Sequence, residues 1–279
     1  MYSLKTILAA TDLTRRGAAV VPRAVQLARL HQARLIIVHA VEPGKGSVKR
    51  FRLGRPAATL ERARSDLAAL CATYPDLDIH CHVEACKPAP LITRIAQENQ
   101  ADLIVLGLHL PRRVLDTLRL TNLERITQTA ACPVLIAHAA SDLPYRKVLG
   151  AITFAPASAR ALRVAAHLAP EAEIHAIHAL QMRRSATNPV AELKTSPEVT
   201  KAETLRQAFL DFEALPDRLT RPEIVPGGVH EVLQFRMNEL DPDLVVIGSH
   251  SGRSATTLGN YARDLMRAPP TDMLIAKPV

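Results

Sequence analysis

Short apolar runs alternate along the chain with longer segments whose apolar positions recur at helical spacing. In residues 1–140 this alternation predicts a β-α order repeated along the chain. The predicted strands are Lys5–Ala10, Arg34–Val41, Leu77–Glu84, Leu103–Gly107 and Val134–His138. The predicted helices are Ala19–His31, Ala57–Cys71, Pro90–Gln97 and Leu123–Ala130. Because runs such as Leu103–Leu106 are apolar at every position, we expect parallel strands that are covered by helices on both faces.

The same pattern then occurs a second time. Ala101–His109 reappears about 141 residues later as Pro242–His250, with the aspartate, the glycine and the histidine in register. Further matches in the same order pair Ile7–Ala10 with Val148–Ala151, Val38–Ala40 with Ile177–Ala179, and Val134–Ala137 with Met273–Ala276. This ordered set predicts two tandem copies of one α/β domain, each a doubly wound, Rossmann-like, five-stranded parallel sheet.

The boundary between the copies is expected in Ala139–Pro144, between the last apolar run of the first copy and the first run of the second. We therefore predict domains at residues 1–140 and 141–279, each long enough to bury a core of its own. The second copy has a longer connection, Gln181–Ser196, whose composition is typical of an exposed loop. Sheets of this kind bind ligands beyond the carboxyl ends of their strands, so the loops after the first and fourth strands are candidate sites.

Composition indicates a globular protein, with 48% hydrophobic and 22% charged residues among 279. Met1–Asp12 holds an apolar run too short for a secretory signal, and no stretch approaches the ~20 apolar residues of a membrane span. These features predict a cytoplasmic protein with no membrane partner. We expect free thiols, as is usual in a reducing compartment, at Cys71, Cys81, Cys86 and Cys132.

The formal net charge of +8 raises the question of a polyanionic partner. Lys and Arg are scattered, however, and form only short clusters such as Lys49–Arg52. Aromatic residues make up 3% of the chain and Trp is absent, so a platform for stacking bases is not expected. Composition therefore argues against nucleic acid as the partner.

These segments resemble those of universal stress proteins, a family of the nucleotide-binding, alpha-hydrolase-like superfamily. The likeness rests on Ile7–Asp12, Asp102–Gly107 and Cys132–Ile136 together with their second-copy equivalents, and it covers nearly the whole chain. The resemblance implies a tandem, two-domain stress-response protein with the adenine nucleotide alpha-hydrolase-like fold. It also implies an intrachain pseudo-dimer in which Val134–His138 faces Leu274–Val279 and each strand covers the other's edge. Whether two such chains form a homodimer is left open.

ATP-binding members of the family carry a glycine loop of the form G-x2-G-x9-G-[S/T] after the fourth strand. Its glycines let backbone N–H groups approach phosphates, and the helix that follows adds a positive dipole. The family also places an aspartate after the first strand toward the nucleoside, and a small residue after the second strand toward the adenine. By resemblance these are Asp12 and Ala40 in the first copy.

In the first copy the glycine loop is broken, because Leu110 and Leu120 stand at its second and third glycine positions. Leucine restricts the backbone and fills space that phosphates need. Arg112 and Arg113 lie nearby, and we interpret them as solvated loop residues in preference to an anion site. The loop residues that this copy keeps are Gly107, His109 and Thr121.

The second copy shows the reverse pattern. Its loop is two residues shorter than the family form and Asn260 replaces Ser or Thr, yet the loop stays polar and keeps glycines. Thr153 stands in place of the acidic Asp12, while Ala179 matches Ala40. The candidate ligand-binding residues of this copy are Gly248, Ser249, His250, Gly252, Gly259 and Asn260.

Structural roles are open for the same residues. Asp12 and Thr14 could serve only as turn and N-cap residues, and Gly107 and Gly248 only as positions of tight packing. Gly248–Gly252 resembles a nucleophile elbow, but its central residue is histidine instead of serine. The sequence contains neither a P-loop with its Lys-Ser or Lys-Thr ending nor a G-x-G-x-x-G motif.

The stretch His80–Cys86 resembles a metal site in its composition. On a strand His80 and His82 point to one face and Cys81 to the other, so these side chains and Cys86 do not converge on one ion. An edge-strand role is therefore preferred to a zinc site, and the sequence requires no metal. Cys86 stands where the family usually has glycine, near the expected ligand mouth, and is a candidate redox-sensitive thiol.

We expect a stress-response binding and regulatory protein with a degenerate adenine-nucleotide site in each half. ATP is the candidate ligand, and a protein partner of unknown identity is implied. A second hypothesis is an enzyme that hydrolyses ATP or transfers its adenylyl group, but paired carboxylates, a general base and metal ligands do not converge near the loop. A third hypothesis is a nucleotide-free scaffold for protein interactions. Neither copy carries a complete nucleotide site.

Overall fold

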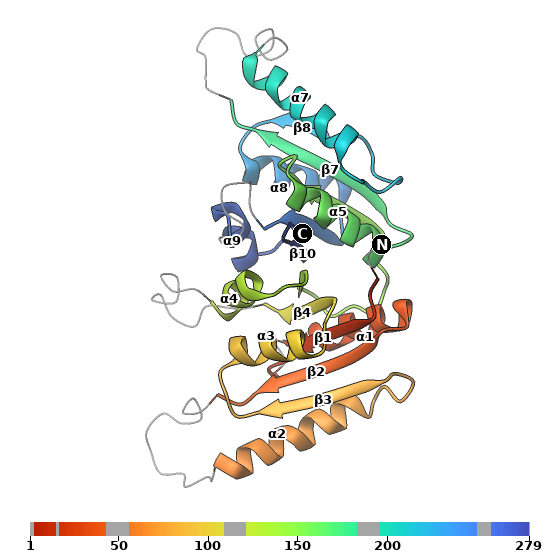
Figure 1. The fold of residues 1–279 in the computed structure, drawn as a ribbon, viewed down its shortest axis with the longest axis vertical. Helices are drawn as coiled ribbons and strands as arrows, with labels where there is room; N and C mark the ends of the chain where they lie inside the picture. The colour runs from red at the N-terminus through yellow and green to blue at the C-terminus, as the bar shows by residue number, and fades with distance from the viewer. Residues whose placement is uncertain are drawn as a thin grey trace. The chain divides into compact units, whose positions relative to one another are not determined.

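The structure is a computed structural model that describes residues 3–14, 17–42, 56–108, 121–182, 196–249 and 258–278 (Figure 1). The chain divides into two compact units. The first contains Ser3–Pro144 and the short segment Met266–Asp272, and the second contains Tyr145–Leu265 and Met273–Val279. Across the described ranges, no helix combines the length and the apolar character needed to cross a membrane.

The first unit alternates strands and helices in the order that the apolar pattern predicts. All the strand pairs of this unit are parallel, and the strand order is β3-β2-β1-β4-β5. The prediction of a doubly wound parallel sheet is thus confirmed. The elements are β1 (Thr6–Ala10), α1 (Val20–His31), β2 (Arg34–Ala40), α2 (Pro56–Cys71), β3 (Ile79–Glu84), α3 (Pro88–Glu98), β4 (Leu103–Gly107), α4 (Asn122–Thr129) and β5 (Val134–Ala137).

The second unit repeats this topology. Its strand order is β10-β9-β6-β7-β8, so β6 takes the central place that β1 has in the first unit. Most of the predicted long loop Gln181–Ser196 lies outside the described residues. The elements are β6 (Lys147–Ala151), α5 (Pro156–Leu168), β7 (Glu173–Leu180), α7 (Pro197–Phe212), β8 (Glu223–Pro226), α8 (Val229–Leu240), β9 (Leu244–Gly248), α9 (Asn260–Arg267) and β10 (Asp272–Ala276).

Four strand ends of the first unit differ from the sequence-based prediction: β1 begins at Thr6 instead of Lys5, β2 ends at Ala40 instead of Val41, and β3 and β5 differ for reasons that hydrogen bonds show. β3 begins at Ile79 instead of Leu77, because the Leu77 N–H donates to the Tyr74 carbonyl (3.3 Å) in a turn. β5 ends one residue earlier than predicted, because the His138 N–H donates to Oδ1 of Asp272 (2.7 Å). In both places a hydrogen bond outside the ladder sets the limit of the strand.

The cores of both units rest on strands in which four successive residues are buried. Leu103–Leu106 in β4 and Leu244–Ile247 in β9 are at most 4% exposed at every position. A run that is apolar at successive positions can be buried in this way only if helices cover both faces of the sheet. The sequence-based expectation for these strands is therefore confirmed.

The repeated aspartate has a structural role in each unit. Asp102 accepts hydrogen bonds from the backbone N–H groups of Lys5 and Thr6 (2.8 and 2.9 Å). Asp243 accepts hydrogen bonds in the same way from the backbone N–H groups of Arg146 and Lys147 (2.9 and 3.1 Å). Each aspartate thus ties the start of the fourth strand to the start of the first, at the end of the sheet opposite to the candidate ligand site.

A buried ion pair lies within the first unit, to which Asp272, the first residue of β10, belongs as the end of the segment Met266–Asp272. Nε of Arg23, on α1, donates to Oδ2 of Asp272 (2.8 Å), and the two side chains are 5% and 4% exposed. The Arg23 guanidinium also donates to the carbonyl of Leu143 (2.7 Å) and to the side chain of Gln26 (3.1 Å). Because Asp272 also accepts from His138, both charged groups are held by several hydrogen bonds away from water.

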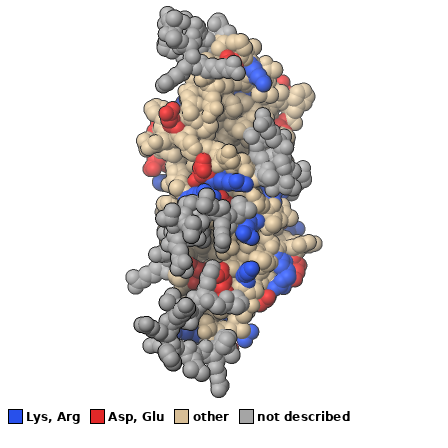
Figure 2. Space-filling view, turned by 90° about the vertical axis from the view of Figure 1, so that its left-hand side faces the viewer, with Lys and Arg blue, Asp and Glu red and all other residues tan. Residues whose placement is uncertain are grey.

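Charged side chains of opposite sign are interspersed on the face shown in Figure 2. Elsewhere on the described surface, charged side chains form ion pairs. Arg29 donates two hydrogen bonds to the carboxylate of Asp76 (2.7 and 2.8 Å), and Arg94 bonds both Glu84 and Glu98. Part of the positive charge of the chain is therefore neutralised locally by neighbouring carboxylates.

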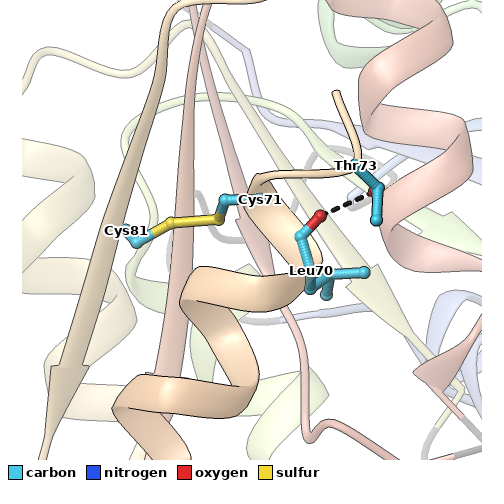
Figure 3. The surroundings of a disulfide bond; sticks show 4 residues. All are labelled: Leu70, Cys71, Thr73 and Cys81. Carbon is cyan, nitrogen blue, oxygen red and sulfur yellow. Dashed lines mark hydrogen bonds between the residues drawn. A yellow bond between two sulfur atoms is a disulfide. The ribbon is translucent and has the colours of Figure 1, made fainter. Parts of the chain in front are cut away.

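Two of the cysteines depart from the sequence-based expectation. The structure joins Cys71, the last residue of α2, to Cys81 on β3 by a disulfide (Figure 3). The prediction of free thiols is therefore wrong for these two positions. Folding brings the two side chains together because α2 packs along β3, and the spacing of cysteines in one sequence does not reveal such a pairing.

Candidate functional site

The candidate site of the first unit lies at the carboxyl ends of β1 and β4. β1 pairs with β2 on one side and with β4 on the other, so the order of the strands reverses at this point. Doubly wound sheets bind their ligands at such reversals. The strand ends bring Asp12, Ala40 and Gly107 to this edge, and Thr121 precedes the helix that follows β4. His109 lies outside the described residues.

Asp12 is exposed in a tight turn after β1. Its Oδ1 accepts hydrogen bonds from the backbone N–H (2.9 Å) and the hydroxyl (2.7 Å) of Thr14. Leu13, between them, has a left-handed backbone with φ of 56°. The turn role considered for Asp12 is therefore present, and it uses one of the two carboxylate oxygens.

Gly17 makes room for the Asp12 carboxylate. A Cβ atom at position 17 would lie 2.6 Å from Oδ1 of Asp12, well inside van der Waals contact. A side chain here would push the carboxylate out of its bonds to Thr14. The sequence interpretation did not include this glycine among the site residues.

In the second unit the positions equivalent to Asp12 and Gly17 are occupied by Thr153 and Ser158. The Thr153 N–H donates to Oγ of Ser158 (3.1 Å), and the two hydroxyl oxygens lie 3.4 Å apart. Leu13 and Phe154 have nearly equal φ values of 56° and 55°, so the turn has the same left-handed residue in both units. An aspartate with a glycine is thus exchanged for a threonine with a serine. This joint exchange between the copies was a signal that the sequence contained.

The fit within each pair predicts a coupled effect. Gly17→Ser alone is expected to lower the free energy of unfolding by about 1 kcal/mol, because Asp12 must give up its bonds to Thr14. Adding Asp12→Thr should recover most of this loss, since the pair then matches Thr153 and Ser158. Urea unfolding of the wild type, the two single variants and the double variant measures the interaction energy. Strictly additive effects would contradict the proposed fit.

A histidine at the end of the second strand holds this turn in each unit. Nδ1 of His39 lies 2.8 Å from the carbonyl oxygen of Thr11, and Nδ1 of His178 lies 2.9 Å from that of Ile152. Because the partner is a carbonyl oxygen, Nδ1 carries the proton and donates it. Both histidines immediately precede the small residue of the candidate site. They were not predicted as site residues, although the repeat displays them in both copies.

The turn of the second unit adds aromatic packing to these hydrogen bonds. The centroid of the Phe154 ring lies 4.6 Å from that of the His178 ring and 5.6 Å from that of the Phe209 ring on α7. The acidic group of the first unit has no counterpart here, because Thr153 stands in its place. This turn therefore lacks the carboxylate that the family resemblance places toward the nucleoside.

Tight packing accounts for the glycines that end the fourth strands. A Cβ atom on Gly248 would lie 2.9 Å from Cβ of Ala157 and 3.0 Å from backbone atoms of Ala157 and Ser158, at the start of α5. A Cβ atom on Gly107 would lie 3.1 Å from Cγ2 of Val20 at the start of α1. The constraint is stricter at Gly248, because backbone atoms cannot give way as a side chain can.

The described ends of the second-unit loop are bonded to one another. The Gly259 N–H donates to the carbonyl oxygen of Ser249 (3.1 Å). The Ser249 N–H in turn donates to the carbonyl oxygen of Ala276 (2.8 Å). Ser249 is 3% exposed. A Cβ atom on Gly259 would have no atom of the described residues within 4 Å, so this glycine faces open space among them. Neither packing nor a left-handed backbone explains it.

Helix α9 begins immediately after Gly259, whose carbonyl accepts from the N–H of Arg263 (3.1 Å). Asn260 is exposed at the first helical position. The first turn of a helix presents N–H groups without intrahelical partners, which suits an anion. His250 and Gly252 of the predicted loop lie outside the described residues.

Thr121 caps α4 in the first unit. Its hydroxyl accepts from the N–H of Glu124 (3.1 Å), and the Glu124 carboxylate accepts from the N–H of Thr121 (2.6 Å). Glu124 is fully buried, and its other oxygen accepts from Arg267 (3.1 Å). The hydroxyl that was predicted to contact a ligand thus serves a capping box.

The histidines considered for a metal site lie on β3, which is an edge strand of the first unit's sheet, as the sequence interpretation expected. His80 pairs with Asp78 (3.3 Å) and His82 with Glu84 (3.2 Å), while Cys81 is disulfide-bonded. Within the part of the chain that the structure describes, no three His, Cys, Asp or Glu side chains are grouped to hold an ion.

Cys86 has an environment that lowers its reactivity. Burial and the carboxylate of Glu84 raise the pKa of the Cys86 thiol, and Arg94 opposes this more weakly. The thiolate is the reactive form, so Cys86 should react more slowly at neutral pH than an ordinary cysteine. The hypothesis of a redox-sensitive thiol at this position is therefore weakened.

A hollow of about 510 Å³ opens at the amino ends of β1, β2 and β3, far along the strands from the candidate site. Lys5, Arg29, Arg34 and Asp76 are among the residues that line it. Arg29 and Asp76 pair with each other across exposed surface. We therefore place the candidate site at the carboxyl ends, where the topology and the polar turn coincide.

Comparisons with known proteins agree with this fold. The model of the universal stress protein family matches residues 3–138 and again residues 144–277. The chain is 30% identical to universal stress protein A homolog 1 of Coxiella burnetii over 137 residues, which is 47% of this chain and 94% of that protein. A solved universal stress protein from Archaeoglobus fulgidus is 18% identical, with 99% of this chain and 97% of the other covered and a TM-score of 0.69.

A smaller relative, a universal stress protein solved in complex with cAMP, is 25% identical; the match covers 50% of this chain and 99% of that one, with a TM-score of 0.37. The two consecutive family matches together span most of the chain. They coincide with a strand order that each unit repeats. The chain therefore belongs to the universal stress protein family and carries two tandem domains of it.

Proposed function

We propose that the protein is a binding and regulatory member of its family that takes an adenine nucleotide at the carboxyl ends of β1 and β4. The observation that carries this proposal is the exposed Asp12 carboxylate at the strand reversal. Thr14 holds it through Oδ1 and Gly17 gives it room. A carboxylate near a strand end is the acceptor that dinucleotide-binding sheets use for ribose hydroxyls. Ala40, at the end of the adjacent strand, leaves space for a base.

The second unit supports a narrower proposal. Thr153 and the packed ring of Phe154 remove the nucleoside side, whereas Gly259 faces open space before the first turn of α9. We therefore infer that this unit binds at most the phosphate part of a nucleotide or another small anion. The first half would then lack an intact glycine loop, whereas the second half would lack the acidic residue of the nucleoside side.

Asp12→Asn is the direct test of the first-unit site. Asparagine keeps an Oδ1 acceptor for Thr14 but replaces the second oxygen by an amide, so the turn should survive. Wild-type protein is expected to bind at least one of ATP, ADP, AMP and cAMP by calorimetry, the last included because a relative was solved with it. The variant should bind roughly 10- to 100-fold more weakly, as expected for loss of a hydrogen bond to a charged group.

Thr153→Val, at the equivalent position of the second unit, is the matched control and should leave the affinity unchanged. Mass spectrometry of the denatured protein would identify any nucleotide that copurifies. An absence of nucleotide and of binding heat would favour the nucleotide-free scaffold. Sustained phosphate release that is lost on His250 substitution would favour the enzyme instead.

Two expectations about assembly and location stay predictions. The intrachain pseudo-dimer and a homodimer of two chains are expected from the family resemblance alone. A cytoplasmic location is expected from composition. Analytical ultracentrifugation and fractionation of the source cells would measure them.

A further inference from the structure

We propose that the Cys71–Cys81 disulfide is a reversible site of thiol–disulfide exchange with small thiols of the glutathione class. The proposal goes beyond nucleotide binding and does not depend on it. The disulfide links the end of α2 to the edge strand β3 (Figure 3). Cys81 is exposed, whereas Cys71 is half-buried. A thiolate in solution can therefore approach the sulfur of Cys81, and exposed disulfides are the ones that exchange most readily.

Bonds that do not involve sulfur hold both cysteines in place. The hydroxyl of Thr73 donates to the carbonyl of Leu70 (2.7 Å) in the turn that follows α2 (Figure 3). Leu67, one turn earlier, is fully buried and anchors the helix. On the other side, Cys81 lies opposite Ile37 in the parallel ladder of β2 and β3. Reduction should therefore leave two thiols close together, and this proximity favours closure of the ring over a second mixed disulfide.

The exchange proceeds in two balanced steps. A small thiolate attacks Sγ of Cys81, the bond between the protein sulfurs breaks, and the leaving Cys71 thiolate takes up a proton. A second small thiolate then attacks the small-molecule sulfur of the mixed disulfide, which releases Cys81 as a thiolate and forms the small disulfide. Two electrons pass from two small thiols to the protein, and the oxidised small disulfide reverses both steps.

Peptide mass spectrometry tests the exchange in native protein. No Lys or Arg lies between Cys71 and Cys81, so trypsin leaves both on one peptide, whereas cleavage before Asp76 separates them unless they are linked. A Cys86→Ser background keeps the neighbouring thiol out of the assignment. Oxidised glutathione should give the linked peptides, excess reduced glutathione should give two alkylated cysteines, and reoxidation should restore the link.

Absence of linked peptides in oxidised glutathione would overturn the proposal. So would a link that yields to reduced glutathione only after the protein is denatured, which is the behaviour of an inert structural bridge. Cys86→Ser and wild-type proteins should behave alike.

The single variants test where the attack occurs. In Cys71→Ser protein, Cys81 should form a mixed disulfide with oxidised glutathione at least about tenfold faster than Cys71 does in Cys81→Ser protein. Both variants lose the same disulfide, so a purely structural effect would not produce this asymmetry. Equal rates would overturn the assignment of Cys81 as the point of attack.

Discussion

Asp272→Asn is expected to lower the free energy of unfolding of the first unit by about 3 kcal/mol. The change keeps the shape of the side chain but leaves the Arg23 guanidinium, 5% exposed, without its counter-charge. An asparagine oxygen can still accept from the N–H of His138, so the loss arises mainly from the uncompensated charge. For a unit of this size the expected fall in Tm is roughly 6–12 °C.

Asp66→Asn is the matched control. Asp66 pairs with Arg62 at 3.8 Å on the surface of α2, where the two side chains are 57% and 85% exposed. Exposed pairs contribute little, so this change should shift the free energy of unfolding by less than about 0.5 kcal/mol. Urea unfolding followed by circular dichroism compares the two, with hydrogen exchange to locate the loss. If the unfolding curve of Asp272→Asn coincided with that of Asp66→Asn, the buried pair of Arg23 and Asp272 would not contribute the expected stability.

Gly248→Ser is expected to destabilise the second unit by about 2 kcal/mol. Any Cβ atom at this position meets Ala157 and the backbone N of Ser158 at 2.9–3.0 Å, so α5 must move away from the end of β9. Close packing tolerates such a displacement poorly, because many contacts along the helix weaken together. Thermal and urea unfolding measure the loss.

Gly259→Ser applies the same substitution at the other end of the loop. Within the described part of the chain no atom lies within 4 Å of a Cβ atom here, and serine is a favoured residue at the start of a helix. We expect stability within about 0.5 kcal/mol of the wild type. Equal destabilisation by the two substitutions would refute the view that one glycine serves packing while the other borders a ligand. A loss of anion binding at unchanged stability would support it.

The order of elements was predictable because apolar periodicity is a local property of the chain. β4 coincides with the predicted Leu103–Gly107, because a short run of consecutive apolar residues, in part β-branched, is typical of a parallel strand buried on both faces. The end of β5 was placed one residue too far along, because a distant carboxylate captures the N–H of His138. The ends of elements depend on partners that periodicity does not show.

The candidate site was predictable in position but only partly in role. Asp12 was identified from the resemblance, and the structure adds that Gly17 must be small to admit its carboxylate. Gly248 was considered for phosphate binding, yet packing against α5 is sufficient to explain it. His39 was not predicted as a site residue, because its hydrogen bond to the backbone carbonyl of Thr11 exists only after the sheet forms.

The sequence by itself determined the α/β class, the duplication and the family, because each is written in patterns repeated along the chain. Tertiary structure alone decided which distant atoms meet. Arg23 and Asp272 are separated by 249 positions and form a buried pair, and Cys71 and Cys81 bond although their spacing gave no sign of it. The physical reason is that burial, steric room and hydrogen bonding depend on the separation of atoms in space. That separation is set only when the helices have packed on the sheet.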